Sequence, residues 1–179
     1  AFHNMGAMDN DAASNFVLDD LGALINEGAF TSAGLFNSAS HAGNITNRNG
    51  GTIVNSGTMN LDGQGTIADL SGAKITNSGR INMFDSLLDN RGTVENTGTI
   101  EVFHFGSYQN LGGLLDIKLR GAFTNAGSTI NLADGVINNA GSIINDRNLV
   151  NAGAMNNLCS GTVDGPVSGN QPVVVCSIK

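Results

Sequence analysis

The sequence predicts an all-β protein, a right-handed parallel β-helix (β-solenoid) with about 20 residues per coil. Three observations support this prediction: one short phrase recurs along the chain, the residues after it alternate between apolar and polar, and no segment has a helical period. The composition is 40% apolar and only 13% charged. Because disorder requires low hydrophobicity together with high charge, this composition indicates an ordered fold with a polar surface.

The recurring phrase is Asn-x-Gly followed by a small polar residue and an apolar one. Clear copies lie at Val54–Met59, Thr76–Ile81 and Glu95–Ile100. Glycine adopts left-handed or strained backbone conformations without steric cost, and Asn tolerates them next best, so the phrase predicts a corner. The alternation after the corner, as in Arg80–Met83, is typical of a short strand with one buried face.

Coils that wind in one sense place equivalent Asn residues on top of one another, and each amide can then bond to the next coil. The sequence therefore predicts a structural asparagine ladder, with Asn26, Asn55, Asn77, Asn96, Asn125, Asn139 and Asn151 as its members. An antiparallel β-sandwich or β-barrel is the alternative, because the same phrase could form hairpin turns. A corner that returns about every 20 residues favours the solenoid.

The repeat covers residues 1–157, and the remainder, 158–179, is expected to be a disulfide-bonded C-terminal cap or assembly segment. Cys159 and Cys176 are the two cysteines of the chain. They predict a disulfide and hence an oxidising compartment, with two buried free thiols as the alternative. The chain starts at Ala1 without an initiator Met, as a secreted product does after removal of its leader, or as a trimmed chain does.

Runs such as Gly51–Leu61 and Gly92–Ile100 resemble the repeats of filamentous-haemagglutinin-type adhesins and autotransporter passengers. The resemblance extends over about residues 22 to 157. It implies a right-handed parallel β-helix on a bacterial or archaeal surface, with a role in adhesion, biofilm or fibre formation, and it carries over no catalytic residues. The chain departs from those passengers in its cysteine pair and in its length of 179 residues.

Charge and motif patterns exclude several other functions. The net charge is −7 and no cationic stripe is present, which excludes a nucleic-acid partner. No apolar run approaches the roughly 20 residues of a membrane span. A polysaccharide lyase or hydrolase needs clustered carboxylates with basic neighbours. The acidic groupings lack such an arrangement and are expected to be solvated: Asp9 with Asp11, Asp19-Asp20, and Asp85 with Asp89.

The remaining candidate residues also point away from catalysis. The histidines His3, His41 and His104 are isolated and have no metal-ligand spacing. We therefore expect no enzyme activity, no catalytic or metal site and no cofactor. Four phenylalanines are expected to stack in the narrow interior rather than to form a carbohydrate platform: Phe84, Phe103, Phe105 and Phe123.

Two functions from different classes fit these patterns. The first is an extracellular structural subunit that self-assembles end to end into a surface filament, a head-to-tail homopolymer. The second is a monomeric cell-surface adhesin segment that binds a host or neighbouring-cell ligand. A solenoid exposes unpaired backbone groups at its ends unless a cap covers them. Because the repeat starts early and the tail is β-branched, we favour the filament, with assembly residues Asn4, Met5, Val173, Val174 and Val175.

Overall fold

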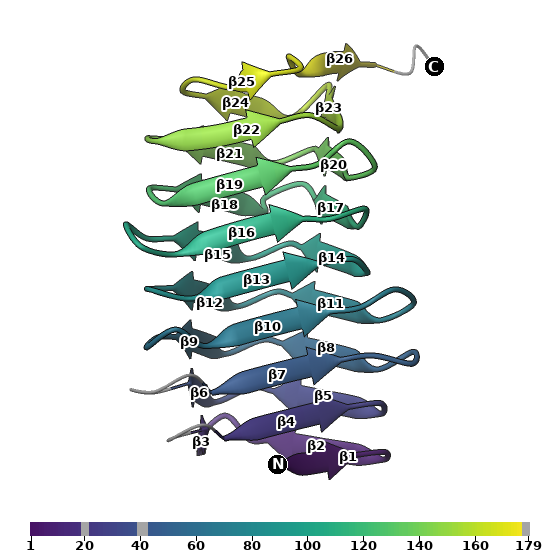
Figure 1. Ribbon diagram of the computed structural model, residues 1–179, viewed down its shortest axis with the longest axis vertical. Coiled ribbons are helices and arrows are strands. Elements are labelled where there is room, and N and C mark those ends of the chain that lie inside the picture. Colours follow the sequence, from purple (N-terminus) through teal and green to yellow (C-terminus); the bar gives the residue numbers. More distant parts are fainter. Residues whose placement is uncertain (19–21, 39–42, 177–179) are drawn as a thin grey trace.

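The protein is a column of stacked coils, each built from three short strands that face one another across a narrow core (Figure 1). The computed structural model describes residues 1–18, 22–38 and 43–176, and within them the chain forms 26 strands. The strands belong to three sheets of nine, nine and eight strands, in which neighbours pair in parallel. The predicted parallel β-solenoid is confirmed.

The three sheets are named A, B and C in the order in which each coil visits them. Sheet A consists of β1 (Phe2–Asn4), β4 (Ala23–Asn26), β7 (Asn44–Asn47), β10 (Thr66–Asp69), β13 (Leu87–Asn90), β16 (Ser107–Asn110), β19 (Ser128–Asn131), β22 (Asn148–Asn151) and β25 (Ser168–Gly169). Sheet B consists of β2 (Ala7–Asn10), β5 (Ala29–Ser32), β8 (Thr52–Asn55), β11 (Lys74–Asn77), β14 (Thr93–Asn96), β17 (Leu114–Ile117), β20 (Val136–Asn139), β23 (Ala154–Leu158) and β26 (Val173–Val175). Sheet C consists of β3 (Asn15–Leu18), β6 (Leu35–Ser38), β9 (Thr58–Leu61), β12 (Arg80–Met83), β15 (Thr99–Val102), β18 (Ala122–Asn125), β21 (Ser142–Asn145) and β24 (Thr162–Asp164).

The coils wind in a right-handed sense. In Figure 1 the front strands run to the right as the chain rises, and the strands behind return to the left. Residues stacked on adjacent coils are between 23 positions apart, as for Ala29 and Thr52, and 17 positions apart, as for Asn156 and Val173. This spacing agrees with the predicted coil of about 20 residues.

The core arises from the alternation within each strand. A typical four-residue strand turns its second and fourth side chains inward, as in β11, where Ile75 and Asn77 are buried. The second positions of all strands of one sheet stack into a file that is mostly apolar. The files run through Leu24, Ile45, Ile67, Leu88 and Tyr108 in sheet A, Phe30, Ile53, Ile75, Val94 and Leu115 in sheet B, and Phe36, Met59, Ile81, Ile100 and Phe123 in sheet C.

The glycines of Asn-x-Gly are required by space rather than by backbone angle. A Cβ atom on Gly79 would lie 2.0 Å from the carbonyl oxygen of Gly57, one coil below. The same contact would be 2.1 Å between Gly98 and Gly79. The expectation that glycines such as Gly79 and Gly98 supply a left-handed backbone is therefore wrong. Among the described residues the glycines with positive φ are Gly50, Gly63, Gly72, Gly112, Gly165 and Gly169, and of these only Gly112 belongs to an Asn-x-Gly phrase. Glycine stacks on glycine because the corner brings two backbones into direct contact.

Substitution of a stacked glycine should destabilise the fold through this contact. We expect Gly79→Ala to lower the free energy of unfolding by about 1–3 kcal/mol, because the methyl group forces the backbones of two coils apart. Gly6→Ala is the matched control, since Gly6 occupies the same motif in the first coil and has no atom within 4 Å of its Cβ position. Urea unfolding of both variants measures the difference, and equal losses would contradict the steric explanation.

Candidate functional site

The fourth, inward position of the sheet A strands carries a column of polar side chains, which we call ladder A. Each Nδ2 donates to the Oδ1 of the next coil: Asn4 to Asn26 at 2.8 Å, Asn26 to Asn47 at 2.7 Å, and Asn110 to Asn131 at 2.7 Å. Every one of these side chains is buried. The full column is Asn4, Asn26, Asn47, Asp69, Asn90, Asn110, Asn131 and Asn151.

The predicted ladder residues do not form a single column. Asn26 and Asn151 belong to ladder A, whereas Asn125 stacks with Asn145 at the end of the sheet C strands. The other predicted residues, Asn55, Asn77, Asn96 and Asn139, belong to a second column at the end of the sheet B strands, which we call ladder B. Ile117 interrupts ladder B between Asn96 and Asn139. Its full set of polar members is Asn10, Ser32, Asn55, Asn77, Asn96, Asn139 and Asn157.

Sequence reasoning missed several members of these columns. Asn90 and Asn110 carry the phrase Asn-x-Gly and could have been found by it. Asn47 and Asn131 precede wider corners in which the glycine comes four residues later and the turn is closed by a backbone hydrogen bond, as from Gly51 N to Arg48 O at 2.8 Å. These residues could be predicted only from their distance along the sequence, because they lie about one coil away from other asparagines that end a strand.

Each ladder amide also holds the corner above it. Nδ2 of Asn77 donates both to Oδ1 of Asn96 at 2.8 Å and to the backbone oxygen of Thr99 at 3.0 Å. Its own Oδ1 accepts from Asn55 at 2.8 Å. One side chain therefore satisfies buried polar groups on two neighbouring coils, and its removal leaves them unpaired.

Loss of a ladder amide should cost more than loss of an outward asparagine. We expect Asn77→Ala to lower the free energy of unfolding by about 1–3 kcal/mol, since two neighbouring amides and a carbonyl lose their partner. Asn148→Ala is the control, because Asn148 is exposed on β22 and its side chain makes no hydrogen bond within the described ranges. Chemical denaturation of the two variants decides this, and similar effects would refute the structural role of the ladder.

The lower end of the stack, formed by β1, β2 and β3, exposes core positions. Phe2, Met8 and Phe16 occupy the file positions of Leu24, Phe30 and Phe36 one coil higher. Phe2 is 53% exposed, and Met8 and Phe16 are only partly buried.

Of the two residues predicted for assembly at this end, Met5 is exposed by 75%. Asn4 is buried instead and turned into ladder A, where its Oδ1 accepts from the backbone of Gly6 at 3.2 Å. Phe2, Met8 and Phe16 were not among the predicted assembly residues, although the period-2 pattern of the strands already starts at Phe2.

The upper end differs from the lower end because it closes ladder A, ladder B and the stack of Asn125 and Asn145 in sheet C. Nδ2 of Asn151 donates to the backbone oxygen of Asn170 at 2.8 Å, that of Asn157 to Gly161 at 3.0 Å, and that of Asn145 to Pro166. In the last coil Val174 stacks on Asn157 and so ends ladder B with an apolar residue. The predicted assembly residues Val173, Val174 and Val175 form β26 and are all exposed.

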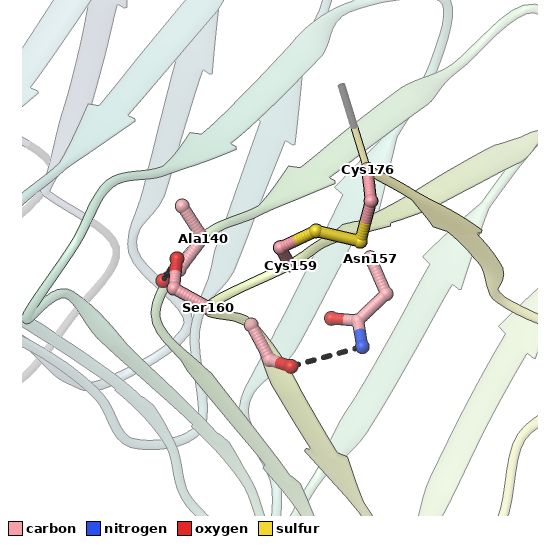
Figure 2. Close-up of a disulfide and its surroundings, with 6 residues drawn as sticks. Ala140, Asn157, Cys159, Ser160 and Cys176 are labelled. Carbon is pink, nitrogen blue, oxygen red and sulfur yellow. Dashed lines mark hydrogen bonds between the residues drawn. A yellow bond between two sulfur atoms is a disulfide. The ribbon is translucent and has the colours of Figure 1, made fainter. Parts of the chain in front are cut away.

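A disulfide joins Cys159 to Cys176 across this end (Figure 2). The pairing of β23 with β26 brings Leu158 beside Val175, so the two cysteines come next in register with Cα atoms 5.1 Å apart. The bridge encloses β24, β25 and β26, that is, one coil. It fastens the last coil to the coil below, and for a loop of this size chain-entropy arguments give about 3 kcal/mol.

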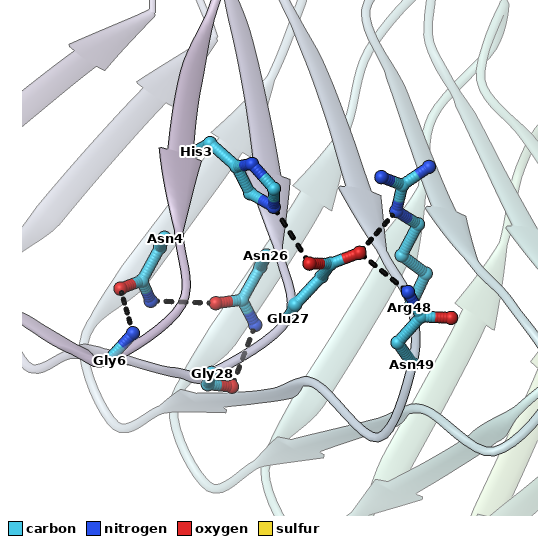
Figure 3. Close-up of polar contacts among 8 residues, drawn as sticks. All are labelled: His3, Asn4, Gly6, Asn26, Glu27, Gly28, Arg48 and Asn49. Atoms are coloured by element: carbon cyan, nitrogen blue, oxygen red, sulfur yellow. Dashed lines mark hydrogen bonds and ion pairs between the residues drawn. The ribbon is translucent and has the colours of Figure 1, made fainter.

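On the outside, ion pairs link neighbouring coils near the lower end (Figure 3). Glu27 accepts from His3 at 2.8 Å and from Arg48 at 2.9 Å, which connects three consecutive coils. The hydrogen bond from His3, with those from Asn49 and Arg48, holds the pKa of Glu27 below its ordinary value. Such ion pairs on the surface contribute little to stability.

Side chains suited to metal binding do not gather in the described ranges. No group of three or more His, Cys, Asp or Glu side chains that could hold a metal ion occurs there. The part of the chain that the structure describes also has no helix long and apolar enough to cross a membrane. Asp19-Asp20 and His41, two of the acidic and histidine candidates, lie outside the described residues.

Aromatic side chains line the corner between sheets C and A in the middle of the stack. Phe84 stacks on Phe103 with ring centroids 4.3 Å apart, and Phe105 stacks on His104 at 4.5 Å. Phe105 is 75% exposed and Phe84 is 37% exposed. The expectation of four interior phenylalanines is thus wrong for Phe84, Phe105 and Phe103, which is half-buried against Phe84 outside the core, and it holds for Phe123, which is buried. Beside Phe105 lies an open groove of about 270 Å³, lined by Gln64, Asp85, Ser86, Leu87, Phe105, Ser107 and Gln109.

Comparisons with known proteins add little to this description. No protein-family model matches the chain, and no curated protein matches it either. Among solved structures, the chain is similar to a crystal structure of a TibC-catalysed, hyper-glycosylated TibA fragment, with 15% identity over 90% of this chain and 77% of that one, at a TM-score of 0.23. A likeness of this size carries no argument about function. The fold itself defines the class: the protein is a parallel β-solenoid closed by a disulfide at one end.

Proposed function

We propose that the protein is an extracellular structural subunit whose coils stack end to end into a filament. The observation that supports this proposal most directly is the exposure of Phe2, Met8 and Phe16 at the lower end, in positions that are buried in the coils above. These side chains form an open cross-section of the core. The surface that complements such a cross-section is another coil of the same shape.

A joint between two copies would be a sheet-to-sheet contact. The edge strands β1, β2 and β3 leave alternate N–H and C=O groups without strand partners, as do β24, β25 and β26. Stacking β24–β26 of one copy below β1–β3 of the next, at about 4.8 Å, would pair these groups. It would also bury apolar area on Phe2, Phe16 and Val174, at about 25 cal/mol per Å².

The two ends differ, which favours a head-to-tail contact over a symmetric one. The upper end has already used its ladder donors on its own backbone, whereas the lower end presents apolar core side chains. A contact between unlike ends is heterologous, and it continues indefinitely when it does not close into a ring. The disulfide would keep the outer coil ordered in an oxidising, extracellular setting.

Charged substitutions at single ends test this proposal. We expect the intact chain to form unbranched filaments, seen by negative-stain microscopy and by fast sedimentation. Phe2→Lys blocks the lower end and Val174→Lys blocks the upper end, so each variant alone should remain monomeric. An equimolar mixture of the two should stop at the dimer, because each partner keeps one working end.

Val54→Lys is the matched control, since Val54 is an exposed apolar residue on the side of the column, away from both ends. It should assemble like the intact chain, and circular dichroism should show the same β content in all variants. Added salt should change little, because the contact is mainly backbone and apolar. An intact chain that stays monomeric at high concentration would refute the filament.

A second function, a monomeric adhesin segment, is favoured by the groove beside Phe105. An exposed aromatic face together with carboxylate, amide and hydroxyl groups is suited to the apolar and hydroxylated faces of a sugar. Asp85 in the groove disfavours phosphorylated or sulfated ligands. The ligand class that fits is therefore a neutral glycan of a neighbouring or host cell.

Binding to a panel of neutral oligosaccharides, with sulfated counterparts beside them, tests this second function. We expect Phe105→Ala to weaken calorimetric binding of a neutral glycan at least tenfold, because the stacking face is lost. Leu119→Ala, a change of another exposed apolar residue that does not line the groove, should leave binding unchanged. Absence of any binding by the intact chain, or equal effects of both changes, would leave the groove without this role.

A further inference from the structure

One rung of ladder A is a carboxyl group. Asp69 ends β10 at the position that Asn47 holds one coil below and Asn90 holds one coil above. It is fully buried, with 0% of its surface exposed. Its Oδ1 accepts from Nδ2 of Asn47 at 2.7 Å, as an asparagine Oδ1 does elsewhere in the ladder. The lower half of the rung is therefore regular.

The upper half of the rung lacks a hydrogen. At the other rungs of ladder A an Nδ2 donates upward to an Oδ1, at 2.7 or 2.8 Å. At this rung neither Oδ2 of Asp69 nor Oδ1 of Asn90 has a hydrogen-bond partner within the described residues. Two buried acceptors on stacked residues thus face a place where the column elsewhere carries a donor.

Rearrangement of the neighbours does not supply that donor. Nδ2 of Asn90 is already used upward, by Oδ1 of Asn110 at 2.8 Å and the backbone oxygen of Leu114 at 3.1 Å. A turned amide would lose both bonds and place two oxygens face to face one coil higher.

Charged groups close to the rung are engaged elsewhere. On the outer surface Arg48 pairs with Glu27 at 2.9 Å, Arg91 with Asp89 at 3.1 Å and Lys74 with Glu95 at 2.9 Å.

The titratable group that shares the interior with Asp69 is the Tyr108 hydroxyl. Burial, more than any other cause, raises the pKa of Tyr108 far above its usual range, so this group stays neutral. It accepts from Nδ2 of Asn90 at 3.2 Å. None of these groups provides a positive charge inside the column to stabilise an anion at Asp69.

We propose that Asp69 holds a proton in the folded solenoid and that its Oδ2–H donates to Oδ1 of Asn90, so that a carboxylic acid takes the place of an amide. The rung is then a proton-binding site that connects the lower and upper parts of ladder A. Loss of the proton would leave a buried anion opposite an acceptor and interrupt the column between β10 and β13. The solenoid thereby becomes sensitive to pH at one defined coil.

The electrostatics of the site agree with this proposal. Burial raises the pKa of Asp69 from 3.8 to about 7, against the opposing effect of the hydrogen bond from Asn47. Between these two values the folded state holds a proton that the unfolded state has lost. Stability therefore falls as pH rises from about 4 to about 7, by up to tenfold per pH unit in the unfolding equilibrium constant, and becomes level above.

The decisive experiment compares the intact chain with Asp69→Asn, which supplies the donor permanently. We expect the variant to unfold at a higher urea concentration than the intact chain at pH 8, and the difference to shrink as the pH falls toward 4. Asp134→Asn removes the same charge from an exposed site and should leave the pH dependence of the intact chain unchanged. Parallel stability curves for the intact chain and Asp69→Asn would overturn the proposal.

A direct titration of the Asp69 carboxyl group tests the proposal without a measurement of stability. Carboxyl carbon chemical shifts in ¹³C-labelled protein should show one aspartate that changes between pH 6 and 8, and this signal should be missing in Asp69→Asn and present in Asp134→Asn. The infrared band of a protonated carboxyl at pH 6 should disappear with it. An Asp69 signal that titrates near the ordinary value of about 3.9 would refute a bound proton.

Discussion

The distance between hydrogen-bonded parallel strands governs the rest of this structure. Because each coil lies about 4.8 Å above the previous one, every residue sits directly on its equivalent, and unlike side chains cannot avoid one another. Phe30 meets Ile53, Gly79 meets Gly57 and Asn77 meets Asn55 for this reason. The sequence repeats for this reason: equivalent positions on successive coils carry residue types that can stack on one another at this distance.

Asparagine suits the inward corner positions because it is both donor and acceptor. A corner turns backbone carbonyl groups toward the core, and an amide can bond to one of them while it passes a second hydrogen bond up the column. Sheet C shows the effect of replacing asparagine by apolar residues at such a corner. Leu61, Met83 and Val102 hold the inward position there, and the outer side of the same corner carries Phe84, Phe103 and the groove.

The fold could be predicted from the sequence because its cause is local and repeated. The Asn-x-Gly phrase and the alternation after it were enough to predict the solenoid, its coil length and the inward position of Asn55, Asn77 and Asn96. The assignment of asparagines to columns could not be made, because three corners per coil use similar residues and two corner lengths shift the spacing. The role of glycine was misread, since its contact with the coil below exists only after stacking. The exposure of Phe105 depends likewise on which side of a corner a residue occupies, and a single sequence has no signal for that.

The same stacking gives the column a direction. Each bond between stacked side chains of ladders A and B runs from a lower Nδ2 to a side-chain oxygen of the coil above, so the columns resemble chains of aligned dipoles. At the upper end the final donors close on backbone oxygens, and at the lower end Oδ1 of Asn4 accepts from the nearby backbone of Gly6. A directional column cannot be inverted without loss of its corner bonds. Two copies can therefore join with their columns aligned only when unlike ends meet, and the same rule explains why a single carboxyl in ladder A must carry a hydrogen on its upper oxygen.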